Sequence, residues 1–241
     1  MTDAATLAGR YTPHMEAPAF EPAAATPLYW ECAACGYLSL DPSFGDAASK
    51  CPACSAAGGG RRRFPPEGQR RLDTRIRAYY GDREWEIVVI LAAALLEALL
   101  EDILDRIMAT HGADVAIRGT LLDQVRAIGV RISRLFPDLT GAEFEDAAAK
   151  LGYRDFPKRW RHVREVRNAF IHDTPYREEA AALDEEAAAQ AMRLLDEAYQ
   201  LFVLLNNEYV AGAGSHAGEG ARTSLHGESV EDPRGHEAAG Q

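Results

Sequence analysis

The chain has 241 residues and a formal net charge of −11, with 26 lysine and arginine residues against 37 aspartate and glutamate residues. This length suits one or two small domains, and the acidic balance excludes a protein that coats nucleic acid with its whole surface. Apolar residues make up 47% of the chain and charged residues 26%, a globular composition that predicts at least one hydrophobic core.

The two ends of the chain lack the pattern of folded segments. Residues 1–27 are rich in alanine and proline, and residues 211–241 contain almost no large apolar side chain. Neither end can bury enough apolar surface to offset the entropy lost on ordering, so we expect both to be disordered. The first 27 residues also lack the basic start and apolar stretch of a secretory signal.

The longest apolar run, Ile87–Leu96, ends at Glu97. A membrane span needs roughly 20 apolar residues, so this run predicts a buried helix. We therefore expect a soluble, cytoplasmic protein without a membrane partner.

All four cysteines fall in residues 28–58, which argues against a disulfide framework spread over the molecule. They form two Cys-x-x-Cys pairs separated by fifteen residues: Cys32 and Cys35, then Cys51 and Cys54. Two such pairs at this spacing predict a tetrahedral four-thiolate metal site. The pair Tyr29-Trp30 leads into the first cysteine as a short strand would.

This segment resembles a zinc ribbon or the paired knuckles of rubredoxin, with Ser55 where a glycine usually follows the second pair. The resemblance implies a structural Zn²⁺ on Cys32, Cys35, Cys51 and Cys54, with iron as the alternative metal. A segment this small cannot fold on its apolar core alone, so we expect the metal to fold it. Four protein thiolates leave no open coordination position for catalysis.

An arginine-rich connector is expected over residues 59–81, after the glycines at 58–60. Its seven arginines are Arg61, Arg62, Arg63, Arg70, Arg71, Arg75 and Arg77, against the two acids Glu67 and Asp73. Such a stripe suits contact with phosphate backbones. It is equally consistent with a linker whose arginines pair with acids of the helical body.

Residues 82–210 are predicted to form an all-α bundle of four or five helices with short connections. Pro65 and Pro66 delay a first helix until Glu67; Gly81 ends it, and Asp82 is expected to cap the next. The expected helices span 67–80, 82–110, 117–134, 141–151, 156–172 and 178–209. The predicted core stripe of the long second helix comprises Leu99, Leu100, Ile103, Leu104, Ile107 and Met108.

The helix expected over 156–172 carries five basic groups between positions 158 and 167 and keeps an apolar face. It contains Arg167-Asn168 and, five residues after the arginine, His172. On an ideal helix these two side chains point about 140° apart. They can meet at one phosphate only if the helix ends or bends between them, which the Thr174-Pro175 stop makes feasible.

The Arg-x4-His motif with asparagine second, in a helical setting, resembles the HEPN superfamily of ribonucleases. The resemblance covers about residues 83–209 and implies a HEPN-like helical domain, RNA as substrate, a homodimer and metal-independent endonuclease activity. It assigns catalysis to Arg167, Asn168 and His172. Histidine exchanges a proton near neutral pH, and arginine offers a permanent charge for the phosphate. The expected products are a 2′,3′-cyclic phosphate and a 5′-hydroxyl.

The resemblance also implies a role in toxin activity, stress response or defence, with a regulatory or antitoxin protein as partner. The tyrosine that often lies two residues after the family histidine is replaced by Thr174, which argues against control by tyrosine modification. One alternative function is a non-catalytic HEPN module that binds RNA or protein, with a structural zinc ribbon. Another is an iron-loaded electron carrier. His172 can also be read as a histidine that the dipole favours at a helix C-terminus.

Overall fold

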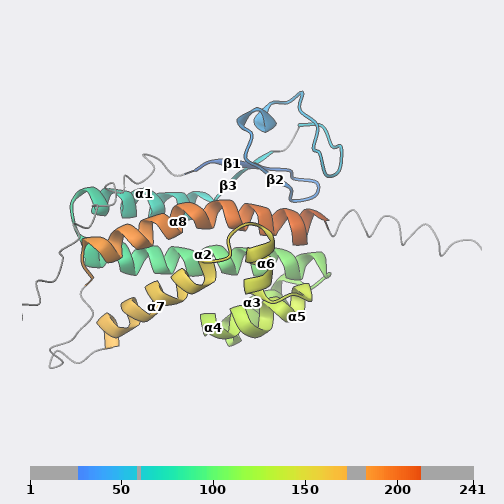
Figure 1. The fold of residues 1–241 in the computed structure, drawn as a ribbon. Helices are drawn as coiled ribbons and strands as arrows, with labels where there is room; N and C mark the ends of the chain where they lie inside the picture. Colours follow the sequence, from blue (N-terminus) through green and yellow to red (C-terminus); the bar gives the residue numbers. More distant parts are fainter. Residues whose placement is uncertain (1–26, 59–60, 173–182, 213–241) are drawn as a thin grey trace, which may run out of the picture.

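The computed structural model describes residues 27–58, 61–172 and 183–212. It is mostly helical, with a small sheet near the N-terminus (Figure 1). Of the two ends expected to be disordered, residues 1–26 and 213–241 lie outside these ranges. Ala211 is buried at the end of the last helix, so the helical body continues past residue 210.

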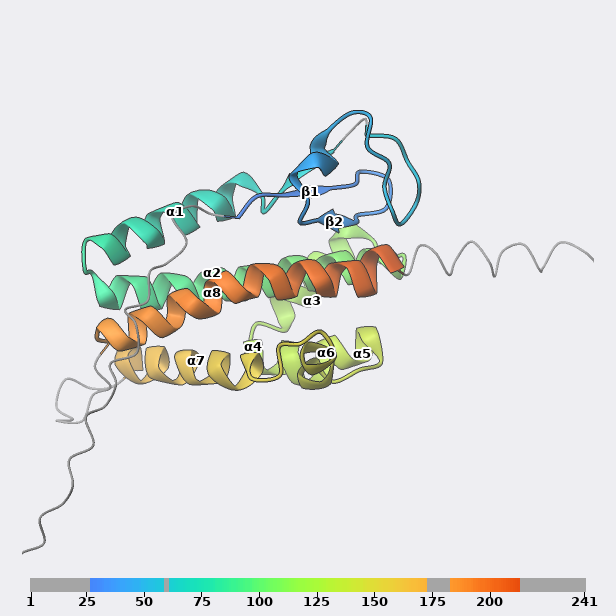
Figure 2. The same cartoon turned by 45° about the horizontal axis from the view of Figure 1, so that its top comes forward.

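The long helix α2 (Trp85–Thr110) is the centre of the molecule. The predicted core stripe from Leu99 to Met108 is confirmed, since all six residues are at most 2% exposed. Helix α8 (Glu185–Asn206) lies along α2, and α1 (Glu67–Gly81) packs on α2 beside it (Figure 1). Turning the molecule by 45° shows α1 on one side of the α2 and α8 pair and α7 (Phe156–His172) on the other (Figure 2).

The helix predicted over 117–134 is wrong, because the chain breaks there into two helical runs. The first is α3 (Val115–Gln124). The second runs through the segments α4 (Ile128–Val130), the π-helical turn η2 (Arg131–Leu135) and α5 (Phe136–Thr140). A short helix α6 (Phe144–Lys150) follows.

The break between α3 and α4 is held by the buried side chain of Arg131. Its guanidinium donates to the carbonyls of Leu122 and Val125 at the end of α3, at 2.8 and 2.7 Å. It also pairs with Glu101 on α2 at 2.7 Å. These bonds satisfy carbonyls that a helix end leaves without partners, and they explain a break that no glycine or proline marks.

Two predicted helix starts also need correction. Asp82 does not cap α2; it has helical backbone angles at the C-terminus of α1, and α2 begins only at Trp85 after Arg83, whose φ is +63°. Helix α8 begins at Glu185 rather than at 178. The side chain of Asp184 accepts from the backbone N–H of Ala187 at 3.0 Å and so caps it.

The cysteine-bearing segment folds around a three-stranded antiparallel sheet of order β2-β1-β3. The strands are β1 (Tyr29–Glu31), which confirms the predicted strand, β2 (Leu38–Ser39) and β3 (Arg62–Phe64). The 3-10 turn η1 (Pro42–Gly45) lies between the last two. Because β3 pairs with β1, the ribbon extends to Phe64, and the first residues of the predicted connector belong to it.

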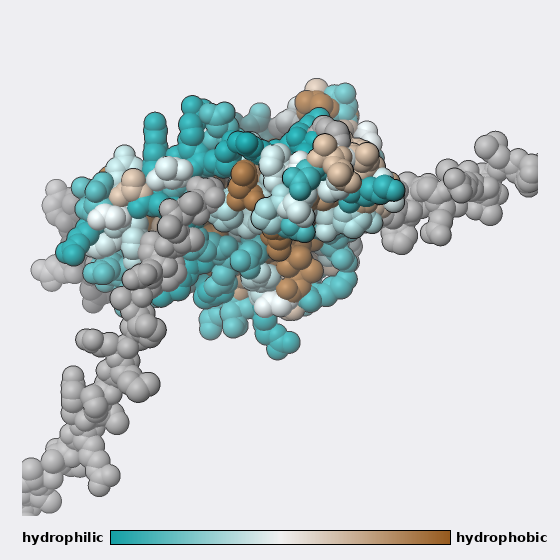
Figure 3. All heavy atoms as spheres, turned by 90° about the horizontal axis from the view of Figure 1, so that it is seen from above, coloured by the Kyte–Doolittle hydropathy of each residue, from teal (hydrophilic) through white to brown (hydrophobic). Residues whose placement is uncertain are grey.

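The face that carries the ribbon and α1 is mainly hydrophilic, broken by small hydrophobic patches (Figure 3). Within the described residues, none of the helices is both long enough and apolar enough to cross a bilayer.

The ribbon is docked on the helical body. Tyr29, Leu38 and Phe64 of its sheet belong to the same hydrophobic core as α2 and α8. Burial and the nearby charges of Tyr153 and Asp196 raise the pKa of Tyr29 to about 12. Glu31 pairs with Arg106 of α2 at 3.1 Å. The ribbon and the bundle therefore share one core.

Two asparagines at the end of α8 fix the ribbon's position. The amide of Asn207 accepts from the backbone N–H of Leu38 at 2.8 Å and donates to its carbonyl at 2.7 Å, so this side chain acts as a further neighbour for the edge of β2. Asn206, fully buried, donates to the carbonyl of Gly36 at 2.7 Å.

Replacing Asn207 with alanine is expected to lower the free energy of unfolding by about 2–3 kcal/mol, because Leu38 is buried and both of its backbone groups would lose their partner. Thermal or urea unfolding measures this change. Glu208→Ala, one residue further on, removes a surface pair with Lys150 and should lower the free energy of unfolding far less, because exposed ion pairs contribute little. Equal losses in the two variants would contradict the role given to Asn207.

Candidate functional site

The two cysteine pairs sit on backbone loops of the same shape. In the first loop, Cys32 donates its N–H to the carbonyl of Tyr37, and Gly36 donates to the carbonyl of Cys32, both at 2.8 Å. In the second, Cys51 donates to Ala56 at 2.9 Å and Ser55 donates to Cys51 at 2.8 Å. These bonds turn each loop so that both of its sulfurs face the same point.

Each loop needs one residue in the left-handed region. Gly36 has φ +73° and Ser55 has φ +60°. Glycine adopts this conformation without strain, whereas serine does so at a cost. A Cβ at Gly36 would also lie 3.2 Å from Val210 beyond the end of α8, so the absence of a side chain there lets the ribbon approach the helix.

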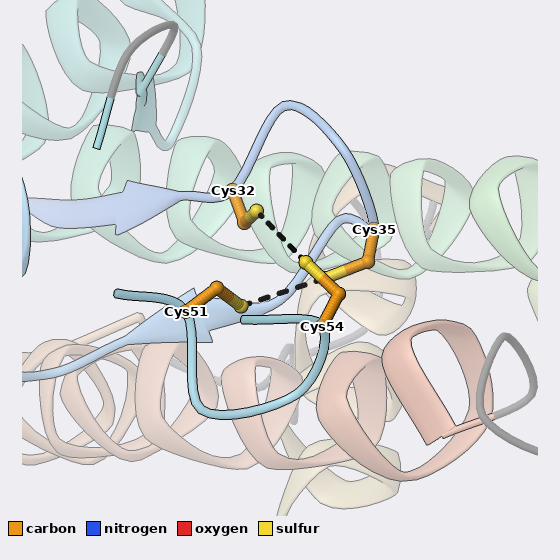
Figure 4. Close-up of side chains that lie close together, drawn as sticks. All are labelled: Cys32, Cys35, Cys51 and Cys54. Atoms are coloured by element: carbon orange, nitrogen blue, oxygen red, sulfur yellow. Dashed lines mark hydrogen bonds between the residues drawn. The ribbon is translucent and has the colours of Figure 1, made fainter. Parts of the chain in front are cut away.

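The four predicted ligands come together, as Figure 4 shows. Their Sγ atoms all lie within 4.8 Å of one another. The Sγ atoms of Cys32 and Cys54 are 3.7 Å apart, and those of Cys35 and Cys51 are 3.6 Å apart. A tetrahedral ion with sulfurs at about 2.3 Å has ligand separations of about 3.8 Å. The cluster can therefore hold a metal ion.

The pKa values of the thiols are not shifted alike. Burial raises the pKa of Cys35 and of Cys51. Burial acts on Cys32 in the same direction, but hydrogen bonds from the backbone N–H groups of Ala34 and Cys35 and from the neighbouring thiols outweigh it and lower its pKa to about 7. Four thiolates this close repel one another, so only a bound cation lets all of them ionise together.

A second, small apolar cluster supports the sulfurs. It contains Cys32, Cys51 and Phe44 of η1. The guanidinium of Arg61 lies 3.7 Å from the Phe44 ring centroid, and it donates to the carbonyls of Phe44 and Ser49 at 3.2 and 3.3 Å. This arginine thus ties the middle loop of the ribbon to β3.

The predicted arginine stripe divides into structural and surface residues. Besides Arg61, Arg77 is structural: it binds Asp73, which is fully buried, at 2.8 Å and Asp196 of α8 at 2.7 Å. Arg62, Arg63, Arg71 and Arg75 are exposed. Pairing with acids of the body, the second reading of the stripe, is therefore correct for Arg77 at least.

The Arg-x4-His motif lies on the last turns of α7, which continues unbroken to His172. His172 is the last described residue of α7. The predicted stop at 174–175 lies outside the described residues. Because the helix neither ends nor bends between Arg167 and His172, the two side chains of one chain diverge rather than converge.

Arg167 is held in place by two neighbours. Its guanidinium donates to Glu97 of α2 at 3.1 Å and to the side-chain oxygen of Asn168 at 3.1 Å. Both Arg167 and Glu97 are partly buried. Glu97, the residue that ends the longest apolar run of the sequence, is thus a partner of Arg167.

A second arginine lies near this carboxylate. Burial lowers the pKa of Arg164; the charge of Glu97 opposes the shift, and the charges of Arg167 and Arg161 add to it. The buried Nε of Arg164 has no hydrogen-bond partner in the described part of the chain. The flank of α7 that faces α2 therefore carries an excess of positive charge in a partly buried place.

His172, Phe170 and Ile171 are exposed on the same helix end, with Phe170 at 40% and Ile171 at 49%. Two other cations of the helix are paired: Arg159 with Glu197 of α8, and Arg161 with Glu145 of α6 at 3.3 Å. No hydrogen bond or ion pair involves the imidazole of His172 within the ranges that the structure covers.

Several structurally important residues were not found from the sequence. Asn206 and Asn207 give a weak signal, two adjacent amides at the end of an apolar helix. Arg131 gives none, because its partners are carbonyls of another helix.

No family model, curated protein sequence or solved structure matches the chain.

Proposed function

We propose that this protein is a metal-independent endoribonuclease of the HEPN type, with a structural zinc ribbon docked on its helical body. The observation that carries the proposal is the setting of Arg167: a guanidinium held by Glu97 and Asn168, beside Arg164 and next to an exposed helix end that carries His172.

The charge balance of this flank favours an anionic ligand. Glu97 pairs with Arg167, and the buried Nε of Arg164 beside it has no hydrogen-bond partner among the described residues. A phosphodiester bound there would restore the balance and accept bonds from the guanidinium groups in the geometry that arginine favours.

A second copy of the chain completes the site in this proposal. The divergence of Arg167 and His172 on one helix means that a single chain does not aim both at one phosphate. The exposed Phe170 and Ile171, between the two residues, supply an apolar surface through which two copies of α7 can meet. We infer that Arg167 of one protomer and His172 of its partner face the same phosphodiester.

The chemistry then follows from the side chains. The ribose 2′-oxygen attacks the phosphorus while its proton leaves, the bond to the 5′-oxygen breaks, and that oxygen gains a proton. His172 exchanges one of these protons. Arg167 stabilises the negative charge that develops on the non-bridging oxygens. A 2′,3′-cyclic phosphate and a 5′-hydroxyl result.

Zinc is the metal we assign to the four cysteines. A closed four-thiolate site is the usual structural coordination of zinc. Iron fits the same ligands, and colour separates the two, because ferric thiolate is red and zinc thiolate is colourless.

The proposal is tested by incubating the full-length protein with mixed RNA in EDTA. Cleavage is expected, with cyclic-phosphate ends, and a substrate with 2′-deoxyribose at the cleaved position should resist. Metal analysis after the assay confirms that the ribbon has kept its ion. RNA that is bound but never cleaved would favour the non-catalytic binding module instead.

A further inference from the structure

A groove between α7 and α8 is the feature that the proposed nuclease site does not use. It encloses about 790 Å³ and is lined by Asp155, Lys158, Arg159, His162, Val163, Gln190 and Arg193. Pockets that hold small ligands range from about 300 to 1,000 Å³, so this groove has room for a ligand of nucleotide size.

The lining is basic although the chain is acidic. Three of its residues carry permanent positive charge, and Asp155 is the one acid among them. Glu197 neutralises Arg159 from α8. Lys158 and His162, four residues apart on one exposed face of α7, have no hydrogen bond or ion pair with any residue that the structure describes.

The groove is separate from the Arg167 site. Lys158 and His162 line the groove together with Gln190 and Arg193 of α8, whereas Arg167 faces Glu97 of α2. The two sites are on opposite flanks of one helix, and a ligand in the groove does not touch Arg167.

We propose that this groove binds the phosphate group of a nucleotide. Lys158 and Arg193 provide the positive charge for the phosphate, with His162 beside them as a further donor. Val163 offers an apolar wall to the nucleoside, and the amide of Gln190 and the carboxylate of Asp155 offer hydrogen bonds to its base or ribose. The phosphate can belong to a free mononucleotide or to the 5′ end of an RNA strand.

Calorimetric titration of the full-length protein tests this, with AMP, adenosine, and a short oligoribonucleotide with and without a 5′-phosphate as probes. AMP or the 5′-phosphorylated strand should bind, and their counterparts without phosphate should bind at least 10-fold more weakly. Binding of AMP identifies a free nucleotide as sufficient; binding of the phosphorylated strand alone identifies an RNA end.

The variants Lys158→Gln and His162→Gln test where the probe binds. Each is expected to weaken binding of the phosphorylated probe by about 10- to 100-fold. Both residues are exposed, so the variants should fold, which thermal unfolding checks. Lys50→Gln makes the same charge change on the exposed surface of the ribbon and should leave binding unchanged. The proposal fails if no phosphorylated probe binds, or if Lys158→Gln and Lys50→Gln bind equally well. The nuclease assay is independent of this result.

Discussion

Replacing Cys51 with serine, or removing the metal with a strong chelator, is expected to unfold the ribbon and to destabilise the whole protein. Cys51 is 1% exposed, and its sulfur is one of the four that lie within 4.8 Å of one another in the candidate metal site. Structural zinc contributes roughly 10–16 kcal/mol in small zinc-binding domains. A ribbon without its metal has only a small apolar cluster around Phe44 to hold that end together.

Loss of the metal should also lower the stability of the helical body, because the ribbon is docked on it through buried contacts. Asn206 and Asn207 bond to Gly36 and Leu38, and Tyr29 and Phe64 pack in the core of α2 and α8. An unfolded ribbon leaves these partners exposed or unpaired. A loss of about 3 kcal/mol from the body would lower its Tm by roughly 6–12 °C.

Two probes follow the change: the fluorescence of the protein's tryptophans, including Trp30 of the ribbon, and the far-ultraviolet circular dichroism of the helices. Metal analysis should find one ion per chain in the wild type and less than a tenth of that in Cys51→Ser. Ala34→Ser alters an exposed residue of the first loop that is not a ligand, and should keep both the ion and the Tm. A helical transition that stays at the wild-type temperature in Cys51→Ser would show that the body is independent of the ribbon.

The parts of this fold that were predicted depend on local pattern. The apolar periodicity of α2, the two prolines before Glu67 and the spacing of the cysteines each act within one segment. The buried stripe of α2, the start of α1 at Glu67 and the clustering of the four cysteines are confirmed. The strand at Tyr29 is local in the same sense.

The errors arise where a distant side chain decides the outcome. The break between α3 and α4 depends on Arg131, which reaches back to α3 and across to Glu101. The ribbon was expected to end near residue 58, yet β3 joins its sheet because Phe64 is buried in the core shared with the bundle. Neither effect leaves a periodic signal in the chain, so neither could be inferred from it.

The candidate sites divide in the same way. The clustering of the four cysteines follows from their spacing alone. In the helical motif, the choice of Arg167 and His172 rests on a resemblance. Packing decides the rest: the continuous helix between them, the pairing of Arg167 with Glu97, and the groove on the other flank of α7. The continuous helix is also the reason why the proposed site takes its two residues from two copies.

The proposed site shared by two copies predicts a second large effect: RNA cleavage should be lost when His172 or Arg167 is replaced. His172→Ala should lower the cleavage rate by about 10²- to 10⁴-fold, the usual contribution of a proton-transferring side chain. Arg167→Ala should lower it by about 10²- to 10³-fold, since it removes a donor to the developing phosphate charge. Arg161→Ala, on the same helix but paired with Glu145, should cleave as the wild type does.

Mixing the two inactive variants then distinguishes a shared site from a site within one chain. If Arg167 and His172 act from different protomers, a dimer of one Arg167→Ala chain and one His172→Ala chain contains one intact site and one that lacks both residues. Random exchange of subunits in an equal mixture makes about half of the dimers mixed, so about a quarter of the wild-type activity should return. If each chain supplied both residues to its own site, no intact site could form and the mixture would stay inactive. Each variant must first elute as a dimer with the wild-type Tm, because Phe170 and Ile171, the surface assigned to the interface, lie between the two replaced residues.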